Sequence, residues 1–164
     1  MFPPDLVERA SALLKRCRAA GLKIATAESC TGGLFAGLLT EIPGSSAVVE
    51  RGFVAYSNEA KEECLGVPPA TIRARGAVSG ETARAMAEGA LKASRANLAV
   101  SITGIAGPDG GSAEKPVGLV WFGCVGRGGS ATRVERFGDI GRDAVRLASV
   151  GVALELLEEA ATRG

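Results

Sequence analysis

One short stretch of the chain, TAESCTGGLF at residues 26–35, concentrates side chains that can do nucleophilic chemistry. A serine or cysteine attacks a carbonyl carbon once a nearby base has taken its proton. Glycines after such a residue permit a tight turn, and free backbone amides in that turn can stabilise an oxyanion. The reactive side chains of this stretch are Glu28, Ser29, Cys30 and Thr31, and the glycines that follow are Gly32 and Gly33.

The base that would serve this nucleophile is not histidine, because the 164 residues contain none. This excludes Ser-His-Asp and Cys-His mechanisms within one chain, and zinc held by histidine. The base must therefore be Lys, Asp, Glu, Tyr or Cys. The four cysteines show no C-x-x-C spacing, which indicates neither a zinc site nor a disulfide framework. We expect the chemistry to need no metal and no organic cofactor.

A lysine in the segment YSNEAK, residues 56–61, is the best candidate for the base. Tyr56 closes a strand-like run, and Lys61 falls in the first turn of the helix that follows. The positive end of the helix dipole disfavours an ammonium group there, which lowers the lysine pKa. The alternative is a solvated lysine on an exposed helix face.

Each residue of the 26–35 stretch also has an ordinary structural interpretation. Ser29 and Thr31 are common residue types at helix starts. Cys30 is either a rival nucleophile or a small buried hydrophobic residue. Glu28 either orients the site or faces solvent. The stretch is not G-x-S-x-G, so it does not indicate an α/β-hydrolase.

Two further segments are candidates for binding an anion or a ligand. Arg142 and Arg146 lie four residues apart near the start of the last helix, where like charges are mildly unfavourable and leave room for an anionic ligand. Pairing with Asp139 and Asp143 is the alternative. The glycine-rich segment 104–118 is long for a connection, and its glycines allow close approach of backbone to a ligand.

The elements that must position these residues follow from the hydrophobic pattern. Strands alternate with helices, and two strands then occur in succession, so we predict a three-layer α/β/α domain with a mostly parallel mixed sheet, spanning 1–164 as a single domain. Ser29, Tyr56 and Thr103 then lie at strand ends and converge on one rim. We expect helices at 5–20, 31–41, 58–65, 79–95 and 141–161, with a short helical turn beginning at Pro68-Pro69. We expect strands at 22–27, 46–56 and 97–105 and in the runs VGLVWFGCV and ATRVERF.

The charge balance excludes several partners. With 19 basic and 18 acidic residues the net charge is +1, which gives no footprint for nucleic acid or for a membrane surface. The beginning of the chain does not resemble a signal peptide, and the longest apolar run, VGLVWFGCV, is too short to span a bilayer. We expect a cytoplasmic protein with reduced thiols.

Taken together, five segments resemble the CinA C-terminal domain family, in family order and over nearly the whole chain. They are TAESCTGG, GSSAVVERGFVAYSNEAK, GAVS, SITGIAGPDGGSAEKPVGLVWF and the weaker GRDAVR. Longer proteins of this family carry an additional N-terminal domain, which we do not expect within these 164 residues. The family often has a compact GDR before the last helix, whereas Ile140 and Gly141 here separate Asp139 from Arg142.

The resemblance implies an enzyme that hydrolyses the carboxamide of nicotinamide mononucleotide (NMN) to nicotinic acid mononucleotide and ammonia, in pyridine nucleotide salvage. It implies an α/β/α fold and a homodimer or larger homo-oligomer. By this resemblance, Ser29 looks like the nucleophile of the family and Lys61 looks like its base. Tyr56 and Ser46 are similar to assisting groups, and Thr103 and Arg142 to site residues, with Arg142 suited to the phosphate.

Combined with the residues, the resemblance predicts a Ser/Lys amidase in which the backbone of Thr31, Gly32 and Gly33 stabilises the oxyanion. Two alternatives stay open. One is a non-catalytic module that binds a nucleotide and regulates a partner, and the other is an amidase for a different small anionic amide.

Overall fold

The centre of the fold is a five-stranded mixed sheet. The computed structural model describes residues 1–163. Its strands are β1 (Ile24–Glu28), β2 (Val49–Val54), β3 (Leu98–Gly104), β4 (Leu119–Gly126) and β5 (Gly129–Arg136), in the order β2-β1-β3-β4-β5. β1 pairs in parallel with β2 and β3, and β4 pairs antiparallel with β3 and β5. Four strands thus run in one direction and β4 runs against them, as predicted.

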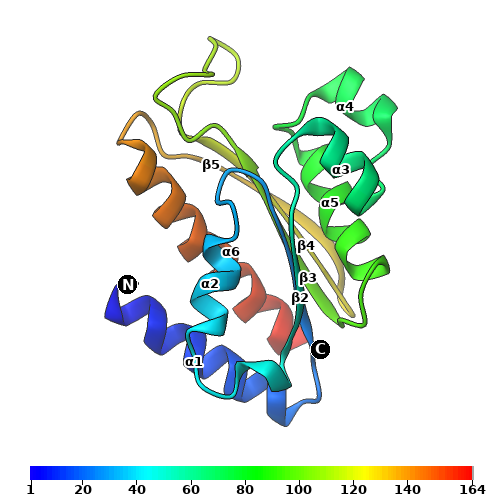
Figure 1. Ribbon diagram of the computed structural model, residues 1–164, viewed down its shortest axis with the longest axis vertical. Coiled ribbons are helices and arrows are strands. Elements are labelled where there is room, and N and C mark those ends of the chain that lie inside the picture. The colour runs from blue at the N-terminus through cyan, green and yellow to red at the C-terminus, as the bar shows by residue number, and fades with distance from the viewer. Residues whose placement is uncertain (164) are drawn as a thin grey trace.

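Helices cover both faces of this sheet (Figure 1). One face carries α1 (Pro4–Ala19), α2 (Leu34–Thr40) and α6 (Arg142–Arg163), and the other carries α3 (Asn58–Leu65), α4 (Pro69–Arg75) and α5 (Gly80–Lys92). A short 3-10 helix, η1 (Ser45–Ala47), precedes β2. The three-layer α/β/α architecture predicted from the alternation of strands and helices is therefore confirmed.

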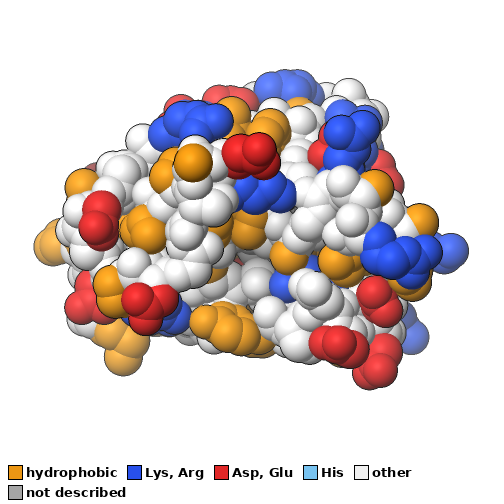
Figure 2. Space-filling view, turned by 90° about the horizontal axis from the view of Figure 1, so that it is seen from above, with side chains coloured by type: hydrophobic (Ala, Val, Ile, Leu, Met, Phe, Trp, Pro, Cys, Tyr) orange, Lys and Arg blue, Asp and Glu red, His pale blue; other side chains and the backbone are white. Residues whose placement is uncertain are grey.

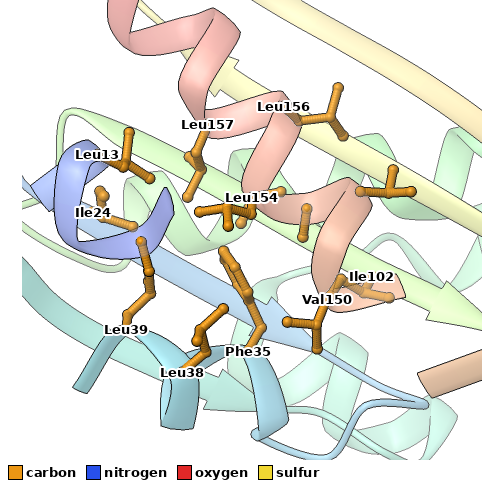
Figure 3. Close-up of a cluster of buried hydrophobic side chains, with 14 of the residues drawn as sticks. Leu13, Ile24, Phe35, Leu38, Leu39, Ile102, Val150, Leu154, Leu156 and Leu157 are labelled. Atoms are coloured by element: carbon orange, nitrogen blue, oxygen red, sulfur yellow. The ribbon is translucent and has the colours of Figure 1, made fainter. Parts of the chain in front are cut away.

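The larger hydrophobic core lies between the sheet and the face formed by α1, α2 and α6. Figure 3 shows Leu13, Phe35 and Leu154 meeting there with their neighbours, and all three are fully buried. Few aromatic residues take part, so most of the core volume comes from Leu, Ile, Val and Ala. Close packing of this kind fixes the strands and α6 relative to one another.

On the opposite face, a glycine allows α3 and α5 to approach closely. A Cβ at Gly89 of α5 would overlap the backbone carbonyl oxygen of Leu65, the last residue of α3. Leu65 lies one turn after Lys61 on the same helix. The packing of α3 on α5 therefore determines where Lys61 stands.

Element boundaries differ from the predicted ones mainly around the turn that follows β1. The helix expected from Thr31 begins at Leu34, because residues 30–33 form turns and Gly33 adopts a left-handed conformation with φ of 99°. The strand expected over 46–56 is shorter, since its first residues form η1. Ser79 caps α5 as predicted, accepting a hydrogen bond from the Thr82 amide at 3.1 Å.

Candidate active site

The carboxyl ends of the parallel strands bring the predicted residues to one rim. Glu28 is in register with Val54 of β2 and Ile102 of β3, so the residues that follow these positions lie together. They border a cavity of about 280 Å³. Figure 2 looks down on this end of the molecule, where charged and hydrophobic side chains surround a hollow. The lining residues are Ser29, Cys30, Tyr56, Asn58, Lys61, Ala77, Val78, Thr103–Gly107, Asp109, Gly110 and Arg142.

Ser29 and Lys61 are in direct contact inside this cavity. The Lys61 Nζ lies 3.0 Å from the Ser29 Oγ, and it also donates to the backbone carbonyls of Ala55 and Tyr56, both at 3.2 Å. A neutral amine has two hydrogens and one lone pair. The two carbonyls accept those two hydrogens, which leaves the lone pair for the Ser29 hydroxyl. The geometry suits a base aimed at a serine.

The surroundings of Lys61 favour that neutral form. Only 1% of the residue is exposed. Burial lowers the pKa of Lys61, because removing water disfavours the ammonium more than the amine, and the neighbouring Cys30 opposes this shift. No carboxylate pairs with Lys61 among residues 1–163. Lys61 is thus a desolvated lysine beside Ser29 and not a solvated lysine on an exposed helix face.

Cys30 is placed poorly to compete as the nucleophile. Its thiol is buried, and this burial raises its pKa to about 11. A thiol attacks as the thiolate, which is scarce several pH units below the pKa. Cys30 therefore fits the interpretation of a small buried hydrophobic residue.

The Glu28 side chain points away from solvent and holds the turn after Ser29. The residue is 1% exposed. Its carboxylate accepts from the Thr31 hydroxyl at 2.6 Å and from the Phe35 and Ala36 amides at 2.8 and 3.0 Å. Glu28 thus caps α2, whose first free amides are already bound and do not face the cavity.

Tyr56 and Arg142 meet at the mouth of the cavity. The Arg142 Nη2 donates to the Tyr56 hydroxyl at 3.2 Å, and its Nη1 donates to the Gly107 carbonyl at 2.8 Å. Tyr56 is 61% exposed. It touches Lys61 through its backbone carbonyl, whereas its hydroxyl is turned toward Arg142. Arg142 is therefore the arginine among the lining residues, and it links Gly107 of the 104–118 segment to Tyr56, which follows β2.

Arg146 has a different position from Arg142. Its Nε donates to the Cys30 carbonyl at 3.1 Å and its Nη2 to the Thr31 carbonyl at 3.2 Å. It holds the turn after Ser29 from outside the cavity. Of the two arginines singled out in the sequence, Arg142 is the one placed to meet an anionic ligand.

Thr103 lies at the end of β3 and is 1% exposed. Its hydroxyl donates to the Ala77 carbonyl at 2.8 Å. This bond ties β3 to the segment before α5, and both residues line the cavity. Thr103 therefore shapes the cavity wall.

Four other residues that the sequence placed in the site do not line the cavity. Thr31 is fully buried and bonds to Glu28, the Gly32 amide donates to the Ser29 carbonyl at 3.0 Å, and Gly33 is the N-cap of α2. Ser46 is exposed in η1, at the amino end of β2 and thus at the opposite edge of the sheet. Within one chain the fold does not bring Ser46 to Ser29.

Two cavity residues have no signal in the sequence that would mark them individually. Asn58 follows Tyr56 by two positions and begins α3, and Asp109 belongs to the glycine-rich segment. The length of segment 104–118 pointed to a ligand-binding loop, but it did not single out a residue within it. Both side chains add polar groups to the cavity.

A second hollow contains none of the predicted catalytic residues. It is a groove of about 930 Å³ between α4, α5 and the β4–β5 hairpin, and it includes Trp121, Arg75 and Arg136. Size alone would favour it, yet only the smaller cavity pairs a nucleophile with a base. Across residues 1–163 no group of His, Cys, Asp or Glu is arranged to hold a metal ion. None of the helices described has both the length and the apolar character that crossing a membrane requires.

Known proteins resemble this chain over nearly its full length. It is 52% identical to "Nicotinamide-nucleotide amidohydrolase PncC" of Escherichia coli K12, covering 96% of this chain and 95% of that one. It is 50% identical to a "CinA-like protein" of Geobacter sp. M21 over 96% of this chain but only 38% of that longer protein. The first relative matches the chain from end to end, and the second contains it as one part.

Solved structures agree in shape. The competence/damage inducible protein CihA of Agrobacterium tumefaciens aligns with a TM-score of 0.96 and 56% identity, over 98% of each chain. A CinA superfamily protein of Escherichia coli aligns with a TM-score of 0.90 and 33% identity, over 97% of this chain and 93% of that one. The family model described as "CinA C-terminal domain" matches residues 7–161 of this chain. With the fold, the motifs and the relatives in agreement, the chain belongs to the CinA C-terminal domain family.

Proposed function

We propose that this protein is a nicotinamide-nucleotide amidohydrolase, which converts NMN and water to nicotinic acid mononucleotide and ammonia by a Ser/Lys mechanism, as one step of pyridine nucleotide salvage. The observation that carries the proposal is the 3.0 Å contact between the Lys61 Nζ and the Ser29 Oγ, inside a cavity and in a chain without histidine. The full-length likeness to the Escherichia coli PncC enzyme supports the substrate.

The first half of the reaction forms an acyl-enzyme. Neutral Lys61 takes the proton of the Ser29 hydroxyl, and the oxygen attacks the carboxamide carbon to give a tetrahedral intermediate. The carbon–nitrogen bond then breaks, and protonated Lys61 returns its proton to the departing nitrogen, which leaves as ammonia. The pyridine carbonyl is now esterified to Ser29.

The second half regenerates the enzyme. Lys61, neutral again, takes a proton from a water molecule, whose oxygen attacks the ester carbon. The ester bond to Ser29 breaks, and the serine oxygen recovers the proton from Lys61. The carboxylic acid product loses its remaining proton to solvent and leaves as a carboxylate. Lys61 carries the protons of each bond-breaking step, so the sequence of steps needs no metal and no organic cofactor.

Arg142 is the group we assign to the substrate phosphate. It lines the cavity, and its guanidinium already holds two oxygen acceptors at the mouth, the Gly107 carbonyl and the Tyr56 hydroxyl. Guanidinium groups pair strongly with phosphate oxygens. Thr103, Asn58 and Asp109 provide polar groups for the remainder of a nucleotide. The four cysteines are free, in keeping with the reducing cytoplasm in which we place the reaction.

Ammonia release from NMN by the purified protein tests the proposal. The wild type should release one ammonia per nicotinic acid mononucleotide, and Ser29→Ala should abolish turnover while the protein stays folded. Cys30→Ala is the matched control, one residue along the same turn, and should keep most of the activity. NMN binding without any ammonia release would favour a regulatory nucleotide-binding module, and turnover of other carboxamides but not of NMN would favour a different amidase.

A further inference from the structure

The larger of the two hollows is a groove that does not include Ser29 or Lys61. It has a volume of about 930 Å³ and is bordered by α4, α5, the β4–β5 hairpin and part of the 104–118 segment. Ligand-binding pockets in proteins commonly have volumes of about 300 to 1,000 Å³. The groove is therefore large enough to hold a nucleotide or a molecule of similar size.

Trp121 gives this groove an aromatic surface. It is the only tryptophan of the chain, and it is half-buried. The indole packs against the start of α5, where a Cβ on Gly80 would lie 3.0 to 3.4 Å from three carbons of its six-membered ring. Val134 of β5 is in register with Trp121, which puts both side chains on one face of the sheet, and it is 38% exposed. The two residues form a partly exposed apolar strip whose aromatic ring is held in place by α5.

Basic side chains lie beside this strip. Arg136 is in register with Leu119, two positions from Trp121, so it projects from the same face of the sheet. The Lys115 Nζ donates to the Arg75 carbonyl at 2.6 Å, and this bond holds Lys115 at the last residue of α4. Cations from three separate segments thus border one hollow.

The groove as a whole carries more positive than negative side chains. Its basic residues are Arg75, Arg84, Lys92, Lys115 and Arg136, and its acidic residues are Glu81, Glu88 and Glu114. Arg75 and Glu81 approach to 3.8 Å, but this pair is exposed and contributes little. The surplus of two positive charges matches a phosphate monoester, which carries about two negative charges near neutral pH.

We propose that this groove is a second binding site, which takes a nucleoside monophosphate with its base stacked on Trp121 and its phosphate held by Arg136 and Lys115. Every base can stack on an aromatic side chain, and basic side chains form strong hydrogen bonds with phosphate oxygens. The proposal does not rest on the Ser29 reaction, since none of the residues that we assign to that reaction borders the groove.

The position of the groove suits a regulatory site. Val78 borders both hollows, and Lys115 belongs to the same 104–118 segment that supplies Gly107 and Asp109 to the catalytic cavity. A phosphate that binds Lys115 competes with the Arg75 carbonyl for its ammonium group. Occupation of the groove therefore loosens one wall of the catalytic cavity and weakens NMN binding there.

Trp121 fluorescence measures occupation of the groove directly, because the chain has no other tryptophan. Adenosine monophosphate (AMP) should quench this fluorescence saturably. Adenosine, which has no phosphate, should bind about 10- to 100-fold more weakly, and ribose 5-phosphate, which has no base, should not quench. An AMP titration without saturable quenching would overturn the proposal.

Calorimetry on folded variants places AMP in the groove. Arg136→Ala should weaken AMP binding by about 10- to 100-fold, and Trp121→Leu by a similar factor through the loss of stacking. Arg127→Ala is the matched control, since Arg127 lies in the turn of the same hairpin but outside the groove, and it should bind AMP as the wild type does. Arg142→Ala should also keep AMP binding. Loss of binding in Arg142→Ala with retention in Arg136→Ala would show that AMP occupies the catalytic cavity, and the proposal would fail.

The regulatory role has its own measurement. Saturating AMP should raise the KM for NMN in the wild type and in Arg127→Ala, and should leave it unchanged in Arg136→Ala. An unchanged KM in a wild type that has bound AMP would refute regulation and keep the site, and a wild type inactive on NMN would refute the proposed function while calorimetry still decides the site. If Trp121→Glu instead converted a dimer into monomers in sedimentation, and the wild type bound no AMP, the groove would be an interface between two copies of the chain.

Discussion

The Lys61 Nζ and the Ser29 Oγ are 3.0 Å apart, although the residues are separated by 32 positions in the chain. Ser29 follows β1, and Lys61 stands in the first turn of α3, which follows the neighbouring parallel strand β2. The Ala55 amide donates to the Glu28 carbonyl at 2.9 Å and extends this strand pairing to the site. Two adjacent strand-to-helix turns thus place a nucleophile and a base in contact.

Tyr56→Phe separates two roles of Tyr56. Phenylalanine keeps the backbone carbonyl that holds Lys61 but removes the hydroxyl that accepts from Arg142. We therefore expect the turnover rate with NMN to stay within a few-fold of wild type and the acid limb of the pH profile to keep its position, while KM rises. Steady-state kinetics across the acid and alkaline limbs would check this. If turnover instead fell by about 100-fold, the lower end of a general acid–base contribution, and the acid limb moved, the hydroxyl would relay a proton to or from Lys61.

Arg142→Ala tests the phosphate assignment. The variant should lose about 10- to 100-fold more kcat/KM with NMN than with nicotinamide riboside, because only NMN carries the phosphate that a charge-assisted hydrogen bond would hold. Arg127→Ala, in the exposed turn between β4 and β5, is the control and should affect neither substrate. Equal losses for NMN and the riboside would assign Arg142 to holding Gly107 and Tyr56 in place rather than to binding phosphate.

Much of this arrangement is predictable from the sequence, because parallel strands share a carboxyl edge. Once Ser29, Tyr56 and Thr103 are placed at strand ends, their convergence follows from the topology. The position of Lys61 was also predictable. Because the chain has no histidine, the base has to be another residue type, and Lys61 is the lysine in the first turn of the helix that follows β2. The type and order of the five strands and of the longer helices followed from the hydrophobic pattern, with boundaries that differ by a few residues, whereas η1 falls where a strand was expected and α4 where only a short helical turn was expected.

The contacts that depend on tertiary packing could not be predicted in this way. Glu28 caps α2 and Arg146 binds two carbonyls. From the sequence, Glu28 could equally orient the site or face solvent, and Arg146 could equally bind an anion or pair with an aspartate. The oxyanion donors were expected in the backbone of Thr31, Gly32 and Gly33, but Thr31 is fully buried, the Gly32 amide donates to the Ser29 carbonyl, and Gly33 is the N-cap of α2. Asn58 and Asp109 join the cavity only through the fold of their segments.

Gly89→Ala tests how α5 positions Lys61. Alanine usually stabilises a helix relative to glycine by about 1 kcal/mol. At Gly89 its Cβ would overlap the Leu65 carbonyl oxygen, so α3 must shift and carry Lys61 with it. We expect a lower free energy of unfolding in urea and a slower reaction of Ser29 with pyridine-3-boronic acid, whose boron adds the serine oxygen. Gly151→Ala in α6 is the control, because its Cβ would meet only Leu6 at an ordinary 3.8 Å. If Gly89→Ala were as stable and as reactive as Gly151→Ala, the close approach of α3 and α5 would not determine the site.

The last prediction concerns the proton on Lys61. An unperturbed lysine has a pKa of ~10.4 and is almost fully protonated at neutral pH. Burial lowers the pKa of Lys61, so its neutral fraction and the single-turnover rate should rise together as pH increases through that lowered pKa. Lys61→Arg keeps a cation that does not deprotonate. It should therefore lose about 100- to 10,000-fold in rate, the usual contribution of a general base, and nearly as much as Lys61→Met.

The same lowered pKa predicts how stability depends on pH. Between the lowered pKa and ~10.4 the unfolded chain binds a proton at Lys61 that the folded chain does not, so the stability of the wild type rises with pH across this window. Below the lowered pKa both states carry the proton, and the folded state bears the full cost of burying it. Lys61→Met has no such proton, so its stability relative to wild type should decline as pH rises toward ~10.4. Urea unfolding of both proteins from neutral pH up to that value measures this difference. A constant difference, together with near-normal turnover in Lys61→Arg, would show that Lys61 remains an ammonium that supplies only charge to the site.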